Sequence, residues 1–129
     1  MRILPTRRKV LSFAAAAGCL ALGLNAPARA ADDIVIGASM PMTGVFAFAG
    51  IALNNAFQDY VKIVNDAGGI NGRKIKYVAE DTGYKVDNSV AVFNRITSQE
   101  KVSLYYGDST AFSKTINAEL NRRGDIMMA

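Results

Sequence analysis

Hydrophobic positions follow a strand-like spacing in some stretches of this chain and a helix-like spacing in others. Residues 34–38 form a short continuous apolar run, which is typical of a strand buried on both faces of a sheet. From about residue 50 to residue 67, apolar residues recur every three or four positions, as in an amphipathic helix. They are Leu53, Phe57, Tyr60, Val61 and Val64. The glycines at 68 and 69 predict the end of this helix, because glycine readily adopts the left-handed conformation found there.

The second half of the chain continues this alternation of strands and helices. After a turn at Asn71-Gly72, residues 74–80 alternate apolar and polar side chains as a strand does, and residues 101–106 predict another strand. We expect Asp87 or Asn88 to cap the helix between them. Its buried face is predicted to hold Val90, Phe93 and Ile96.

A third helix and a short fourth strand complete the pattern. Phe112, Ile116 and Leu120 recur at four-residue spacing, and Gly124 ends the helix. Short connections between alternating strands and helices predict an α/β fold, with a parallel sheet and helices on both faces. Residues 125–129 begin a strand that stops without a turn or a cap. We therefore expect residues 31–129 to be an incomplete N-terminal lobe of a longer protein; a complete small domain with a short edge strand is the alternative.

The first thirty residues predict a signal peptide. A basic start, which holds Arg7 and Arg8, precedes an apolar run at residues 11–24. That run is about 14 residues, shorter than the ~20 that a membrane-spanning helix needs. Ala28-Arg29-Ala30 supplies the small residues that signal peptidase requires, so we expect cleavage after Ala30 and a periplasmic location.

Residues near the N-terminus indicate candidate routes of export. Residues 6–12, Thr-Arg-Arg-Lys-Val-Leu-Ser, resemble a twin-arginine signal in which Ser12 replaces the usual lysine. General secretion is the alternative. Cys19 follows Ala-Ala-Gly, a weaker match to a lipoprotein box. All of these routes lead out of the cytoplasm.

Removal of the signal changes the charge of the chain. Five of the 15 basic residues and none of the 11 acidic ones lie in residues 1–30, so the remainder has ten basic and eleven acidic side chains and a net charge of −1. This balance gives no support for a nucleic-acid partner. The only cysteine also leaves with the signal, and the chain has no histidine, so we expect no disulfide and no histidine-based metal site or catalytic base.

Candidate binding residues follow the first and third strands. In a parallel sheet, ligands bind beyond the carboxyl ends of the strands, where helix N-termini present free N–H groups. Ser109 and Thr110 place hydroxyls at such a helix start, where they could bind a carboxylate. One of them could instead be the helix cap. In the first loop, Phe46 and Phe48 could form an apolar wall or pack beneath the loop.

Nucleotide-binding motifs are absent from the sequence. Gly37, Gly44 and Gly50 do not have the G-x-G-x-x-G spacing, and there is no phosphate-binding G-x-x-x-x-G-K. Asp81, at the end of the second strand, is therefore interpreted as a turn residue, and we expect no cofactor.

Three segments resemble the type I periplasmic substrate-binding proteins of ABC transporters, in particular the leucine/isoleucine/valine-binding branch. They are Ile-Val-Ile-Gly at 34–37, Met-Thr-Gly at 42–44, and Asn-Asp-Ala-Gly-Gly-Ile-Asn-Gly-Arg-Lys-Ile at 65–75. The resemblance implies part of a two-lobed clamshell that binds a small solute such as an amino acid without catalysis. It further implies ABC permease subunits as partners and a monomeric receptor.

The resemblance also implies binding residues, which are Phe48, Asp108, Ser109, Thr110, Ala111 and Ser113. The chain departs from the family pattern at two positions. Ala111 stands near a frequent ligand-binding serine, and Ala49 replaces a frequent tyrosine. Small amides, urea-like solutes and aromatic acids therefore join branched-chain amino acids as possible ligands. A ligand-sensing receptor ectodomain with the same fold is the alternative function, followed by an exported α/β enzyme, for which no G-x-S-x-G elbow or paired carboxylates are evident.

Overall fold

The computed structural model describes residues 32–128. The expected signal peptide, with Cys19 and the cleavage site after Ala30, lies outside this range. Within it, strands and helices alternate along the chain. The strands are Ile34–Met40 (β1), Ile75–Asp81 (β2), Val102–Tyr106 (β3) and Met127–Met128 (β4), and the helices are Ala47–Asp66 (α1), Val86–Gln99 (α2) and Thr110–Arg123 (α3).

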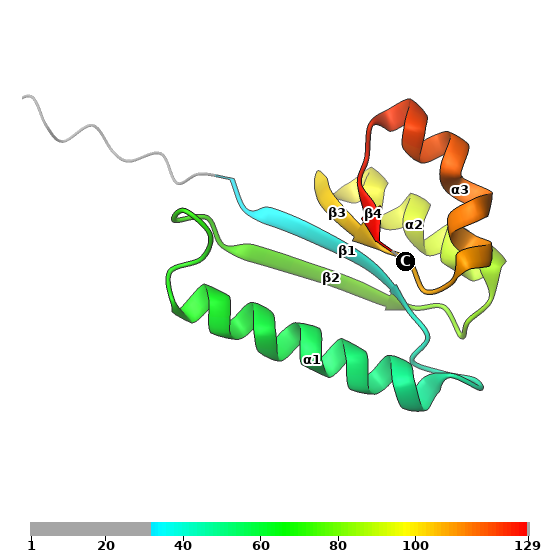
Figure 1. The fold of residues 1–129 in the computed structure, drawn as a ribbon, viewed down its shortest axis with the longest axis horizontal. Helices are drawn as coiled ribbons and strands as arrows, with labels where there is room; N and C mark the ends of the chain where they lie inside the picture. The colour runs from blue at the N-terminus through cyan, green and yellow to red at the C-terminus, as the bar shows by residue number, and fades with distance from the viewer. Residues whose placement is uncertain (1–31, 129) are drawn as a thin grey trace, which may run out of the picture. The chain divides into compact units, whose positions relative to one another are not determined.

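The four strands form one parallel sheet in the order β2-β1-β3-β4. Helix α1 covers one face of the sheet, and α2 and α3 cover the other (Figure 1). The α/β fold with helices on both faces is therefore confirmed. Strand β1 lies in the interior of the sheet, and residues 37–40 are buried, as the continuous apolar run predicted. None of the helices in residues 32–128 has the length and apolar character required to cross a membrane.

The main hydrophobic core lies between the sheet and the α2/α3 layer. Phe93 meets the ring of Tyr105 edge-on, with 5.0 Å between the ring centroids, and Phe112 packs against both. The buried residues of this core are Val92, Phe93, Ile96, Tyr105, Phe112, Ile116 and Leu120. The predicted buried positions of α3 are confirmed, and those of α2 differ only in that Val90 is half-buried.

Helix α1 buries only part of the predicted stripe: Phe57, Val61 and Val64 are half-buried. Leu53 and Tyr60 are exposed, whereas Gly50 and Asn54 are buried. Two contacts explain this rotation. Gly50 allows the helix to approach Pro41 closely, and Asn54 Oδ1 accepts a 3.2 Å hydrogen bond from the Tyr77 hydroxyl. Spacing of apolar residues could not predict the burial of Gly50 and Asn54, because one is small and the other is polar.

The predicted cap of α2 is wrong. Lys85 is the N-cap, it has extended backbone, and its side chain makes no capping hydrogen bond. Asp87 lies in the first turn, where its charge favours the helix dipole, and Asn88 Nδ2 donates to Thr82 O at 3.0 Å. Other boundaries shift modestly: α1 begins at Ala47 rather than near residue 50, and β4 contains only two residues. The predicted helix ends are confirmed, since glycines 68, 69 and 124 all have positive φ.

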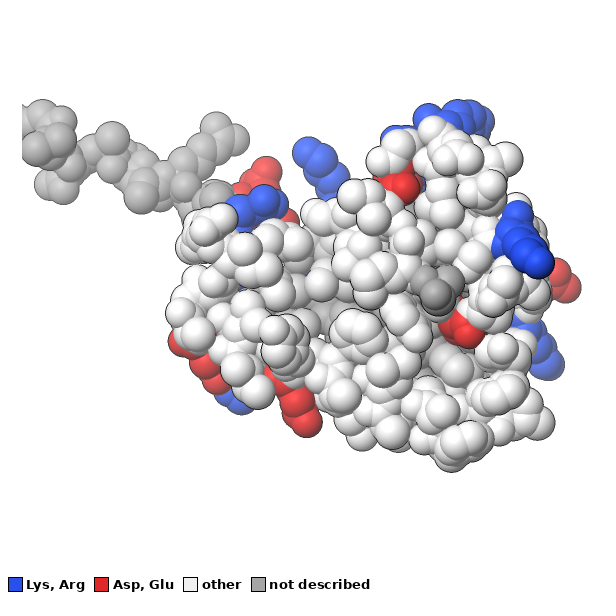
Figure 2. Space-filling view, in the orientation of Figure 1, with Lys and Arg blue, Asp and Glu red and all other residues white. Residues whose placement is uncertain are grey.

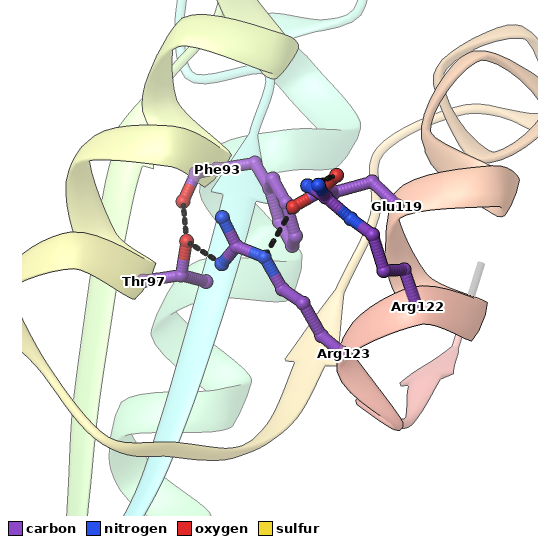
Figure 3. Close-up of polar contacts among 5 residues, drawn as sticks. All are labelled: Phe93, Thr97, Glu119, Arg122 and Arg123. Carbon is purple, nitrogen blue, oxygen red and sulfur yellow. Dashed lines mark hydrogen bonds and ion pairs between the residues drawn. The ribbon is translucent and has the colours of Figure 1, made fainter.

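A polar contact at the C-terminal ends of α2 and α3 joins these two helices (Figure 3). Arg123 Nη1 donates to Thr97 Oγ1 at 2.8 Å, and its guanidinium lies 5.4 Å from the centre of the Phe93 ring. Glu119 accepts from Arg123 Nε at 2.5 Å and also from Arg122. These contacts hold the two helices together at the end of the sheet opposite the loops described next.

Candidate functional site

The chain leaves two neighbouring strands in opposite directions. After β1 it passes to α1 on one face of the sheet, and after β3 it passes to α3 on the other (Figure 1). In an open α/β sheet, such a divergence of loops at the carboxyl ends of the strands creates a crevice in which ligands bind. The loops at 41–46, 82–85 and 107–109 border this part of the molecule.

The carboxylate of Asp81 holds the first loop against the second. Asp81 Oδ1 accepts from the backbone N–H groups of Met42 (2.8 Å), Thr43 (3.0 Å) and Gly83 (3.1 Å), and Oδ2 accepts from Thr43 Oγ1 at 2.6 Å. Partial burial opposes ionisation of Asp81, but the hydrogen bonds from Thr43, Gly83 and Met42 outweigh it and lower its pKa. The interpretation of Asp81 as a turn residue agrees with the bond to Gly83, and the structure adds its role in fixing the first loop.

An aromatic pair extends this contact towards the crevice. The rings of Phe46 and Tyr84 lie 4.2 Å apart between centroids, with 48° between their planes. Tyr84 has a φ of 60°, an uncommon conformation for a residue other than glycine. Because Asp81 fixes the loop on which Phe46 lies, the two loops present one aromatic wall.

A second carboxylate, Asp108, joins the loops after β2 and β3. Its Oδ2 accepts from Thr82 Oγ1 and, at 2.8 Å, from Ser89 Oγ. Thr82 and Ser89 are both buried. Asp108 Oδ1 is also buried but has no hydrogen-bond partner within residues 32–128. The three loops are thus linked by two carboxylates.

A hollow of about 220 Å³ lies between these loops, the end of β3 and the start of α1. It is lined by Pro41, Phe46, Ala49, Gly50, Leu53, Tyr84, Tyr106 and Asp108. Asp108 supplies the only charged side chain among these lining residues, and the others are apolar or aromatic. The nearby surface over the N-terminal half of α1 is likewise free of charged side chains (Figure 2). An apolar hollow with a few polar groups is typical of a small-molecule site.

Only one of the six binding residues predicted from the sequence lines this hollow. Asp108 lines it, but the other five do not. Ser109 is the N-cap of α3 and accepts from Phe112 N–H at 3.2 Å, and Ser113 Oγ donates to Ser109 O at 2.9 Å. Thr110 and Ala111 are exposed in the first turn of α3, and no acceptor for their backbone N–H groups lies in the described part of the chain. Their roles stay predictions.

The two aromatic residues predicted for the first loop lie in different surroundings. Phe46 lines the hollow, whereas Phe48 is 78% exposed in the first turn of α1. Two further lining residues, Tyr84 and Tyr106, were not predicted from the sequence. Both lie at or just after the carboxyl end of a strand, so the placement rule that identified Ser109 and Thr110 would also have identified them.

A second hollow, of about 200 Å³, lies near the start of β3. It is lined by Thr97, Glu100, Lys101, Val102, Arg123 and Asp125. Its position at the amino end of β3 places it away from the crevice. Between residues 32 and 128, no group of three or more acidic, cysteine or histidine side chains is placed to hold a metal ion.

Comparisons with known proteins relate this architecture to solute receptors. A family model described as periplasmic binding protein matches residues 33–127. An amino acid binding protein from Pseudomonas aeruginosa is 36% identical over 101 residues, which cover 78% of this chain and 26% of that protein. A Leu/Ile/Val-binding protein homolog 1 from Brucella abortus is 33% identical over 92 residues, with coverages of 71% and 24%. The chain thus spans about a quarter of the length of these curated relatives.

A solved structure shows the same fold. It is the branched-chain amino acid transporter substrate binding protein LivJ from Streptococcus pneumoniae, in complex with isoleucine. The TM-score is 0.66 at 27% sequence identity, and the match covers 74% of this chain and 28% of that one.

Proposed function

This chain belongs to the periplasmic binding protein family, and from that membership we propose that it forms the N-terminal lobe of an exported solute receptor for an ABC-type uptake system. The solutes are branched-chain amino acids or related small amides and acids, and they are bound without chemical change. The names of the relatives support an amino-acid or related ligand. The proposed partners are the membrane subunits of the permease, which receive the solute from a periplasmic receptor.

The observation that carries this proposal is the hollow at the carboxyl ends of β1 and β3. Four of its residues come from three loops that Asp81 and Asp108 link together, and the other four come from α1 and β3, so its wall is formed before a ligand arrives. A preformed wall reduces the ordering cost of binding. The start of α3 offers free N–H groups at the same end of the sheet, which suit a polar group of a solute.

Isothermal titration tests the proposal. The full-length polypeptide that contains this chain is titrated with leucine, isoleucine, valine and a panel of small amides and acids, and the solute recovered afterwards is analysed by mass spectrometry. We expect saturable binding of at least one member and unchanged solute. The absence of binding across the panel, or conversion of a bound compound, would overturn the proposal.

Two further measurements test the partner and the location. We expect the purified receptor loaded with solute to stimulate ATP hydrolysis by its permease in proteoliposomes, and an unloaded receptor to do so less. We also expect the protein in the periplasmic fraction of its cells.

A further inference from the structure

The carboxylate of Asp108 has an unusual position in the wall of the hollow. Thr82 and Ser89 donate to its Oδ2, while its Oδ1 is buried without a hydrogen-bond partner in the described structure. Buried polar atoms in folded proteins nearly always have a partner, so an unpartnered carboxylate oxygen at a binding site indicates a place for a donor. The two hydroxyls that already donate to Asp108 cannot donate the same hydrogens to a ligand.

No positive charge balances this carboxylate within the part of the chain that the structure describes. The ion pairs there involve other acidic residues, and neither lysine nor arginine lines the hollow. The hydroxyls suggested for a ligand carboxylate, those of Ser109 and Thr110, do not line the hollow, and Ser109 Oγ accepts from Phe112 N–H as the cap of α3. The charge that borders the hollow is therefore negative, opposite to what a solute carboxylate needs.

The remaining wall suits an apolar group. Phe46 and Tyr84 present packed rings, and Leu53 and Tyr106 continue the apolar lining. Flat and branched apolar groups both fit such a surface. The hollow therefore combines an apolar wall with one uncompensated carboxylate.

Building on the proposed function, we propose that the solute places a nitrogen donor, an ammonium or a carboxamide, towards Asp108 and its apolar body against Phe46 and Tyr84. Any carboxylate of the solute points away from Asp108. Asp108 is then the residue that determines specificity in this lobe: it selects amino acids, amines and amides over acids that lack a nitrogen donor. Charge-assisted hydrogen bonds supply this selectivity.

Matched probes test the selectivity in the full-length polypeptide. One set shares a branched body (3-methylbutylamine, 4-methylpentanamide and 4-methylpentanoate), and the other shares a phenyl body (2-phenylethylamine, 3-phenylpropanamide and 3-phenylpropanoate). Isothermal titration at neutral pH is expected to show the amine and the amide binding at least about tenfold more tightly than the acid with the same body. Equal or tighter binding of the acids would overturn the inference.

The variant Asp108→Asn tests the residue itself, because it preserves the size of the side chain and removes its charge. We expect the amine-to-acid ratio of affinities to fall by about tenfold. Asp87→Asn is the control: it removes an exposed carboxylate from the first turn of α2, and the ratio should not change. An unchanged ratio in a folded Asp108→Asn protein would contradict the assignment.

The remaining outcomes are also decisive. If Asp108→Asn does not fold, as judged by circular dichroism, the ranking of the probes by the unmodified protein decides. If leucine binds but the truncated probes do not, a loss of leucine affinity of about tenfold in Asp108→Asn supports the inference, and no loss overturns it. If neither the probes nor the amino acids bind, the proposed function itself fails.

Discussion

Replacement of Gly50 by alanine has two opposing effects on the free energy of unfolding, both at the start of α1. Gly50 is buried in the first turn of this helix. A Cβ atom added there would lie 2.1 Å from the carbonyl oxygen of Pro41 and 2.6 Å from its carbonyl carbon. Real Cβ atoms essentially never approach another heavy atom within 3.0 Å, and here the neighbour is backbone. Either the helix start or the first loop must therefore move by about 1 Å.

The two effects have known sizes. In a helix, alanine is more favourable than glycine by about 1 kcal/mol. Overpacking against atoms that cannot easily move costs roughly 1–3 kcal/mol and sometimes more. Since the contact is with backbone, we expect the clash to exceed the gain, so that Gly50→Ala lowers the free energy of unfolding by about 1–2 kcal/mol. Pro41 and Gly50 both line the hollow, so the same movement should weaken solute binding.

Urea unfolding followed by circular dichroism measures this effect in the full-length polypeptide. The control is Asn55→Ala, an exposed position in the same helix, which should gain the helix propensity of alanine without a clash. A Gly50→Ala protein that is as stable as the parent, or more stable, would refute the close approach of α1 to the first loop.

Three further predictions address the loops, the core and the N-terminus. Because the pKa of Asp81 is lowered on folding, its charge stabilises the protein above its ordinary pKa of about 4, and this contribution disappears as the pH falls through the lowered value. The difference in unfolding free energy between the parent and Asp81→Asn should therefore shrink from pH 7 to pH 3, and a constant difference would contradict this. Tyr105→Phe should cost about 1–2 kcal/mol, because it leaves the buried hydroxyl of Ser39 without its 2.8 Å partner, and adding Ser39→Ala should recover part of that loss; thermal unfolding showing no recovery would contradict the pairing. Edman sequencing of the exported protein should begin at Ala31, and an intact N-terminus would contradict the predicted signal.

The sequence predicted those parts of the fold that depend on local spacing and on glycine. Phe112, Ile116 and Leu120 are all buried, as their four-residue spacing indicated. The positive φ angles of Gly68 and Gly69 at the end of α1 follow from the same local chemistry. The parallel sheet follows from the order of the elements, because crossovers between parallel strands have one preferred hand.

Features that depend on contacts between distant segments could not be predicted in this way. Tyr60 fits the spacing of a buried stripe but is 66% exposed, because contacts at Gly50 and Asn54 set the rotation of α1. The candidate site also depends on contacts between distant segments. The sequence placed Asp108 beyond β3, but the pairing of Phe46 with Tyr84 joins two loops that are far apart along the chain.

We propose that a small solute binds at the carboxyl ends of β1, β2 and β3. Hydrogen exchange of the full-length polypeptide, measured by mass spectrometry with and without a saturating solute, tests the location most directly. We predict slower exchange in the loops at 41–46, 82–85 and 107–109, with little change at the start of β3 near Val102 and Arg123. Protection near Val102 and Arg123, with the three loops unaffected, would contradict solute binding at these loops.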